Sequence, residues 1–529
     1  MSSSRTEIGF LVAACAVVVV ALAVPLVAAG PASLSPMTAT TAGDATPTEN
    51  ATSTADVSET ADVSETADVS ETADVSETAD ASETITVETD TAATSVTATD
   101  TDGVATVGDE TYDGAQTAVD AADPGDTVVL DGRFDERLNV TTDEVTIVAG
   151  DGGAVLDGGG EGRVLTIGGE NVTLSGLWIR GSGSDVGSED AGVFVAGDDA
   201  RIETVRITDS AYGIWLDSAD GTVVSDVRID GRDDVYPVTE RGNGIHLYET
   251  TGTIVRDSEI REVRDGIYFS WSTDVLAANN TIRNTRYGVH YMYSDDNRLV
   301  DNVAADNGVG YALMVSEGLT VRNNTAVRND DTSGHGVLAK DIERSEIGGN
   351  VLVDNANGLY VYNAQDNEIT DNLVLANDVG IHSSAGSEGQ LVAGNSFVAN
   401  AEAVVTPRNS LVEWNGTDRG NYWSNARTVD RTGDGVSEIR HRPSGLVEHL
   451  VSEHPQAAVF ANSPSFEAVR LAESSFPVIE SPGVVDQHPL VEPPHDWRAH
   501  ANRTRAERTR ADRSETHPDE ESRTEEHHP

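Results

Sequence analysis

The sequence has almost no cysteine and almost no lysine. Among 529 residues there is one cysteine, Cys15, which lies inside an apolar stretch near the N-terminus. A disulfide-stabilised fold and a thiolate metal site in the folded part are therefore excluded. Lys340 is the sole lysine, so arginine supplies almost all of the basic side chains.

Basic residues of any kind are few compared with acidic ones. The 34 Lys and Arg residues face 90 Asp and Glu residues, and the formal net charge is -56. Such a surface repels phosphate polymers, which argues against nucleic-acid binding. An acidic coat spread along the whole chain, with arginine in place of lysine, is typical of proteins that stay soluble in concentrated salt.

Long apolar runs are absent except at the start of the chain. The run over residues 9–29 predicts that residues 1–30 are a signal peptide or an N-terminal membrane anchor, so we expect an exported protein at the extracytoplasmic face of the cell membrane. Residues 31–103 are rich in Thr, Ser, Ala, Asp and Glu and repeat the hexapeptide ADVSET. This composition predicts a disordered acidic stalk, and the charged residues 496–529 predict a disordered tail.

A short phrase recurs through the middle of the chain: a glycine followed by alternating apolar and polar residues. Gly244, Gly266, Gly288 and Gly310 begin four such phrases at intervals of 22 residues. Alternation with period two indicates strands, and a fixed interval of this length indicates a solenoid. The sequence therefore predicts an all-β fold, a right-handed parallel β-helix of about 22-residue coils over residues 104–424.

The remaining features fit this architecture. Longer intervals between phrases predict loops at residues 231–243 and 329–335. GNYWS predicts a cap on the open end of the β-helix, with Tyr422 and Trp423 over the core. Residues 425–495 then form a small C-terminal capping segment, in which residues 445–471 are expected to be helical with Leu446, Leu450 and Val451 on one side.

A column of asparagines recurs at the coil spacing, each before another strand. Asparagine tolerates left-handed backbone and hydrogen-bonds its own turn, so we expect these residues to stack at coil corners as a structural ladder. The residues are Asn280, Asn302, Asn324, Asn350, Asn372 and Asn395.

The alternation also predicts which side chains face outward. Counting the phrase glycine as zero, positions one and three point inward and positions two and four point outward. The outward positions carry aromatic, histidine and methionine side chains, unlike the rest of the acidic surface, and predict a partner-binding face. Its aromatic members are Trp215, Tyr248, Tyr268, Tyr360 and Tyr362.

Two methionines occupy equivalent positions on consecutive coils. Strand spacing puts the backbones of Met292 and Met314 about 4.8 Å apart, with His290 about 7 Å away on the same face. Thioether and imidazole ligands without thiolate suit copper, particularly Cu(I). His246 lies two coils from His290 and joins such a site only by a long reach. The alternative is that the methionines are simply adaptable contact surface.

Several strings resemble one known family. RYGVHYMYS from Arg286, RDGIYFSWS from Arg264, GYALM from Gly310, SGHGVL from Ser333 and GNYWS from Gly420 are similar to NosD proteins, and the resemblance runs over about residues 106–494. It implies an exported, non-catalytic β-helix protein that helps to mature the copper centres of nitrous-oxide reductase. The implied partners are that reductase, the permease and ATPase subunits of an ABC transporter, and a copper chaperone. Membrane association would follow from the N-terminus or from the transporter.

Three further hypotheses about sites and function stay open at this point. Asp430, Asp434 and Glu438 in DRTGDGVSE approximate a calcium loop, although the final bidentate acid is not at its expected place.

A secreted β-helix is also compatible with a polysaccharide lyase or hydrolase. In a glycoside hydrolase, the two catalytic carboxylates lie about 5 to 9 Å apart. On the outward face considered, Asp217 is the only acid. The third reading is a passive surface adhesin displayed on the stalk.

Overall fold

The computed structural model describes residues 101–329, 334–384, 386–406, 411–460, 463–475 and 483–502. The expected signal or anchor, nearly all of the expected stalk and most of the expected tail lie outside these residues. Within them, no helix is both long and apolar enough to cross a membrane.

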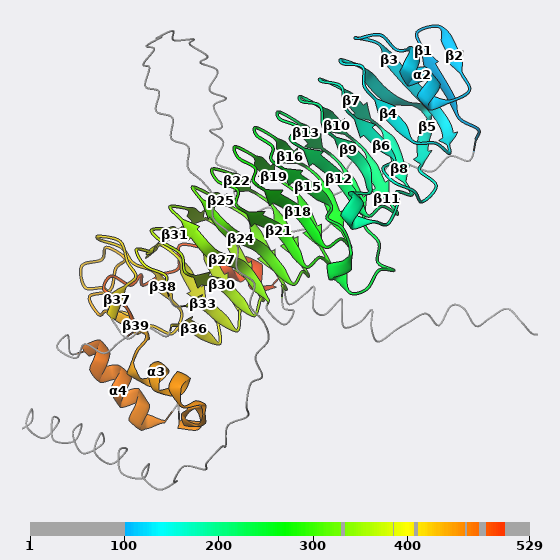
Figure 1. Cartoon of the computed structure of the whole chain (residues 1–529). Helices are drawn as coiled ribbons and strands as arrows, with labels where there is room; N and C mark the ends of the chain where they lie inside the picture. Colours follow the sequence, from blue (N-terminus) through cyan, green and yellow to red (C-terminus); the bar gives the residue numbers. More distant parts are fainter. Residues whose placement is uncertain are drawn as a thin grey trace, which may run out of the picture. The chain divides into compact units, whose positions relative to one another are not determined.

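The chain winds into a parallel β-helix, as predicted (Figure 1). A typical coil contains three strands: β18 (Asp265–Ser270), β19 (Leu276–Ala278) and β20 (Thr281–Arg283). The next coil then starts with β21 (Tyr287–Met292), which pairs with β18 in parallel. The strands thus stack in three ladders, one of which forms a separate 12-stranded sheet. We call that sheet the wide ladder, because it holds the longest strands of the repeating coils.

The ladders are built from the following strands. The wide ladder adds to β18 and β21 the strands β4 (Leu138–Val140), β6 (Leu165–Ile167), β9 (Ala191–Val195), β12 (Tyr212–Asp217), β15 (Ile245–Tyr248), β24 (Val309–Glu317), β27 (His335–Glu343), β30 (Asn357–Tyr362), β33 (Val379–Ser383) and β36 (Glu402–Val405). The second ladder adds to β19 the strands β7 (Thr173–Ser175), β10 (Arg201–Glu203), β13 (Val223–Ser225), β16 (Ile254–Arg256), β22 (Arg298–Val300), β25 (Thr320–Arg322), β28 (Glu346–Gly348), β31 (Glu368–Thr370) and β34 (Leu391–Ala393). The third ladder adds to β20 the strands β8 (Leu177–Arg180), β11 (Arg206–Thr208), β14 (Arg228–Asp230), β17 (Glu259–Arg261), β23 (Val303–Ala305), β26 (Thr325–Val327), β29 (Val351–Val353), β32 (Leu373–Leu375), β35 (Ser396–Val398) and β38 (Tyr422–Trp423).

The N-terminal end is closed by a different arrangement. Strand β1 pairs antiparallel with both β2 and β3, and β3 joins the first parallel pairs through β5. Helix α2 buries Ala115, Ala118 and Val119 against the same core. These elements are β1 (Val104–Val107), β2 (Glu110–Tyr112), α2 (Ala115–Ala121), β3 (Thr127–Phe134) and β5 (Thr146–Asp157).

The phrase glycine lies where each coil bends into the wide ladder. A Cβ atom on Gly266 would lie 2.4 Å from the carbonyl oxygen of Gly288 and 2.4 Å from Ile282, so no other residue fits. Gly266 and Ile267 both face the interior at this bend, so the alternation restarts there. As a result Asp265, just before the glycine, shares the outer face with Tyr268.

The interior is a continuous apolar core, as the alternation predicts. Phe269 and Tyr291 stack one coil apart, with ring centroids 4.2 Å from each other, and both are essentially unexposed. The other predicted inward residues of this ladder are equally buried: Ile245, Leu247, Ile267, Val289, Tyr311, Leu313, Leu359 and Val361.

The predicted asparagine ladder is present and buried. In Asn324 the backbone N–H and the Nδ2 group both donate to Oδ1 of Asn350, and Nδ2 also donates to the carbonyl oxygen of Leu299. The expectation that the ladder asparagines themselves adopt a left-handed backbone is wrong, however. That conformation belongs to the residue before each asparagine, such as Asn323 with φ 56°. A second ladder of the same kind was not predicted: Asn307, Asn329, Asn355, Asn377 and Asn400.

The C-terminal end is capped through Trp423, as GNYWS predicts. Its ring stacks on Phe397 at 4.3 Å, and its Nε1 donates to the buried Asp486 at 2.8 Å. The expected helix over residues 445–471 is instead divided, since Pro455 and Pro464 each begin a new element, and Val447 rather than Leu446 is buried. The elements are β37 (Leu411–Glu413), β39 (His441–Ser444), α3 (Leu446–Glu453), a 3-10 helix (Pro455–Phe460), α4 (Pro464–Ser475) and β40 (Gly483–Asp486).

We expect Asn324→Ala to lower the free energy of unfolding by about 3 kcal/mol, because the change leaves buried donors and acceptors of two neighbouring coils unpaired. Urea unfolding measures this difference. Asn139→Ala is the matched control, since Asn139 is an exposed residue of β4 that hydrogen-bonds to Gln116 through its backbone N–H and carbonyl groups. Equal losses of stability in the two variants would contradict the ladder's role.

Candidate functional site

The outer surface of the wide ladder carries two side-chain columns that run along the β-helix. Each side chain lies directly beside its counterpart in the next coil, because the strands pair in exact parallel register. The column at position two contains Trp215, His246, Tyr268, His290, Ala312, Leu338, Tyr360 and His382. The column at position four contains Asp217, Tyr248, Ser270, Met292, Met314, Lys340 and Tyr362.

Met292 and Met314 are register partners in β21 and β24, as predicted. His290 precedes Met292 by two residues and points to the same side of the sheet. The register partner of His290 is Ala312, which is buried in an apolar cluster against which Tyr287 and Met314 pack. Both methionines are half-buried. The structure therefore places these three residues side by side on one face of the sheet, with backbone spacings of about 4.8 Å between strands and about 7 Å along one strand.

His290 is held in a defined orientation. Its Nδ1 lies 3.1 Å from Oδ2 of Asp265, while its Nε2 is buried and has no hydrogen-bond partner among the residues that the structure describes. A carboxylate can only accept, so Nδ1 carries a proton, and in the neutral imidazole Nε2 then presents a lone pair. This is the carboxylate–histidine arrangement found behind many metal-bound imidazoles.

Asp265 is the buried anchor of this arrangement. The carboxylate is unexposed and accepts two hydrogen bonds from Arg286, at 2.8 Å and 2.5 Å. Burial alone would raise the pKa of Asp265, but the hydrogen bonds from His290 and Arg286 outweigh burial and hold this pKa below its ordinary value. The carboxylate therefore stays ionised and keeps the His290 tautomer fixed.

His246 lies two coils away, and Tyr268 lies between the two imidazoles. The Tyr268 ring contacts His246 and His290 edge-on, with centroid distances of 4.7 Å on both sides. Burial, together with the positive charge of Arg264, lowers the pKa of His246 to about 3. His246 is thus neutral, but the structure does not bring it together with His290.

The predicted partner-binding face is only partly exposed. Trp215 is 8% exposed, contrary to expectation, because Tyr212 packs edge-on against it and belongs with it to a cluster that also includes Val186, from the 3-10 helix Val186–Ser188. Tyr248, Tyr268 and Tyr360 are half-buried, whereas Tyr362 is 40% exposed. Aromatic rings on neighbouring coils shield one another from solvent. Strand alternation predicts only that a side chain points outward, and not how much of it is exposed.

Sequence reasoning missed two kinds of residue. It placed position zero at the glycine and so overlooked the preceding position, which holds Asp265, Tyr287 and His335. It also stopped at position four, whereas Trp271 and Tyr293 at position five are the exposed aromatic residues beside the methionines. The sequence does contain a sign of these two residues, because an aromatic residue directly follows the predicted strand in FSWS and in YMYS.

The expected calcium loop forms a hydrogen-bonded turn. Asp430 accepts from the backbone N–H groups of Gly433 and Gly435, Asp434 accepts from Val436, and Glu438 accepts from the N–H of Arg431. Among the described residues, no three His, Cys, Asp or Glu side chains gather as a metal site. The geometry therefore gives the calcium prediction no support.

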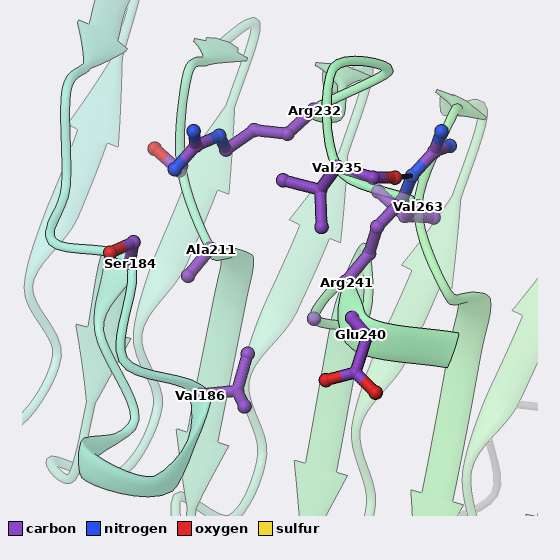
Figure 2. A pocket seen from close by; sticks show the side chains of 10 residues that line it. Ser184, Val186, Ala211, Arg232, Val235, Glu240, Arg241 and Val263 are labelled. Atoms are coloured by element: carbon purple, nitrogen blue, oxygen red, sulfur yellow. Dashed lines mark hydrogen bonds between the residues drawn. The ribbon is translucent and has the colours of Figure 1, made fainter. Parts of the chain in front are cut away.

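A small pocket lies between two loops away from the methionines. Figure 2 shows Ser184 and Val186 on one side and Arg232, Val235 and Arg241 on the other. Arg241 donates to the carbonyl oxygens of Val235 and Glu262, and Arg232 pairs with Asp234. These guanidinium groups therefore bind partners within the protein and hold together a loop that contains the 3-10 helix Val238–Glu240.

The chain is similar to proteins of one family over most of its length. Residues 226–428 match the family model described as periplasmic copper-binding protein (NosD). A protein of Pseudomonas aeruginosa named "Probable ABC transporter binding protein NosD" is 42% identical over 408 residues, which cover 74% of this chain and 94% of that protein. A protein of the same name from Stutzerimonas stutzeri is 42% identical over 359 residues, covering 65% of this chain and 81% of that protein.

Among solved structures, the catalytic unit of an alpha-1,3-glucanase from Streptomyces thermodiastaticus is similar at 16% identity and a TM-score of 0.45, over 59% of this chain and 62% of that one. The relationship in sequence is much stronger, since the identity of 42% extends over nearly the whole of the Pseudomonas aeruginosa protein. On that basis this chain belongs to the NosD family.

Proposed function

We propose that this protein is an exported accessory factor that binds copper and helps to mature the copper centres of nitrous-oxide reductase, acting with an ABC transporter. The names of its relatives and the description of the family support copper binding, a periplasmic location and an association with such a transporter. The proposed partners are the reductase, the permease and ATPase subunits of the transporter, and a copper chaperone.

The observation that carries the proposal is the grouping of His290, Met292 and Met314. Two thioether sulfurs and one imidazole nitrogen form a soft, neutral ligand set, which suits Cu(I) better than calcium or magnesium. Nε2 of His290 is buried without a hydrogen-bond partner among the described residues, so its lone pair is free for a metal ion. Copper is here a cargo that the protein receives and passes on.

A carbohydrate-cleaving activity is not favoured by this site. The carboxylate nearest to His290 is that of Asp265, which is fully buried and held by Arg286. Hydrolysis of a glycosidic bond needs one carboxylic acid that donates a proton to the leaving oxygen. Because its pKa is lowered, Asp265 is poorly suited to that role.

We expect the double variant Met292→Leu and Met314→Leu to lose Cu(I) binding, because leucine keeps the apolar volume but removes both sulfur ligands. A competition titration with a chromophoric Cu(I) chelator measures the affinity. Tyr248→Phe changes the same column two coils away from Met292 and is the matched control. Unchanged Cu(I) affinity in the double variant would place the copper site elsewhere.

Asp265→Asn tests the residue that orients His290. We expect Cu(I) affinity to fall roughly 10- to 100-fold, as for other carboxylates that support metal-bound histidines. Nitrogen NMR of the labelled imidazole should also show loss of the fixed tautomer, a change that simple destabilisation does not produce. Asp217→Asn, a carboxylate change on the same face, should leave both quantities as in the wild type. A variant that keeps both the affinity and the tautomer would refute this role.

A further inference from the structure

Two aromatic side chains form an exposed stack at the corner where the wide ladder ends. Trp271 is 56% exposed and Tyr293 is 46% exposed, although each follows a strand whose other rings are buried or half-buried. Their ring centroids are 4.5 Å apart and their planes differ by 11°. The β-helix thus presents a paired aromatic surface to solvent, and Tyr293 directly follows the proposed copper ligand Met292.

The backbone at both positions is left-handed. Trp271 has φ 57° and Tyr293 has φ 55°, a region that bulky residues rarely adopt. The same position is left-handed in other coils too, at Ser218, Glu249, Val315, Asp341 and Asn363, so this backbone conformation belongs to the corner of the fold. Asp and Asn tolerate the conformation better than Trp and Tyr do, so the aromatic pair stands where a smaller polar residue would fit with less strain.

Acidic side chains surround the pair. The turns of three successive coils, residues 271–274, 293–296 and 315–318, contain acidic residues and no Arg, Lys or His. Asp274 and Asp296 are exposed in these turns, whereas the exposed Glu317 pairs with Arg344 of the next coil. A group that both stacks on an aromatic ring and pairs with carboxylates fits this surface, and the arginine guanidinium does both.

We infer that the Trp271–Tyr293 pair anchors a docking surface for the protein that exchanges copper at this site, and that this partner presents arginine side chains. The inference rests on the proposed function and deepens it, because it assigns the surface on which the partner sits. Trp and Tyr are the residue types that most often dominate the energy of an interface. A partner seated here lies beside Met292 and Met314, so docking and metal exchange occur at one place.

The test uses the double variant Trp271→Asn and Tyr293→Asn in the full chain. Its affinity for copper-free nitrous-oxide reductase, measured by calorimetry, should fall at least about tenfold. Its Cu(I) affinity should be unchanged, and its melting temperature should rise, because asparagine accepts the left-handed backbone. Phe460→Asn, which removes another exposed aromatic residue, is the matched control and should bind the reductase like the wild type.

An arginine oligopeptide and its citrulline analogue provide a second measurement. The wild type should bind the arginine peptide but not the citrulline peptide, and the double variant should bind neither. The docking inference is overturned if the wild type does not bind the reductase, or if the double variant binds it as tightly as the wild type does. It is also overturned if the melting temperature of the double variant falls, or if the wild type binds a polyuronate instead of the arginine peptide. Failure of the wild type to bind Cu(I) would refute the proposed function instead.

Discussion

Hydrogen bonding between successive coils fixes the position of every other feature in this protein. The backbone of each coil pairs with the next in parallel register, and the buried asparagines add side-chain bonds in the same direction, as from Asn302 to Asn324. Loops that lengthen a coil do not disturb this register. Ile214 still pairs with Ile245 although the loop at residues 231–243 separates them along the chain, so extra residues are accommodated outside the ladders.

The same constraint determines the chemistry of the outer surface. Side chains one coil apart are forced into contact, so a column becomes a continuous stack in which neighbours shield one another. Tyr268 is therefore held between His246 and His290, and the two imidazoles are kept apart. Where the column has a small residue, at Ala312, the stack is interrupted beside His290. The interruption falls at the coil that supplies Met314, which packs against the apolar cluster around Ala312.

Fold, coil register and the methionine pair could be predicted from the sequence, because all three follow from a fixed interval and from alternation. Met292 and Met314 needed only their distances from the preceding glycines. Asp265 could not be found in this way, since the bend at Gly266 places two successive residues inward and shifts the alternation. Trp215 is buried in a cluster with Tyr212 against which Val186 also packs, and the contact of Val186 with this cluster follows from no periodic pattern. Trp271 and Tyr293 lie at a corner, where strand alternation no longer applies.

The proposed copper site combines one rigid ligand with two flexible ones. His290 is fixed by Asp265, which in turn is fixed by Arg286, so the imidazole nitrogen has one position relative to the β-helix. The methionines have long, unbranched side chains that change rotamer easily, and they are only half-buried. A rigid nitrogen defines where the ion sits, whereas flexible thioethers can follow the ion as it leaves. Because the whole ligand set is neutral and contains no thiolate, release requires no protonation of a sulfur ligand. This division of roles suits the proposed transfer of copper to a partner at the adjoining corner.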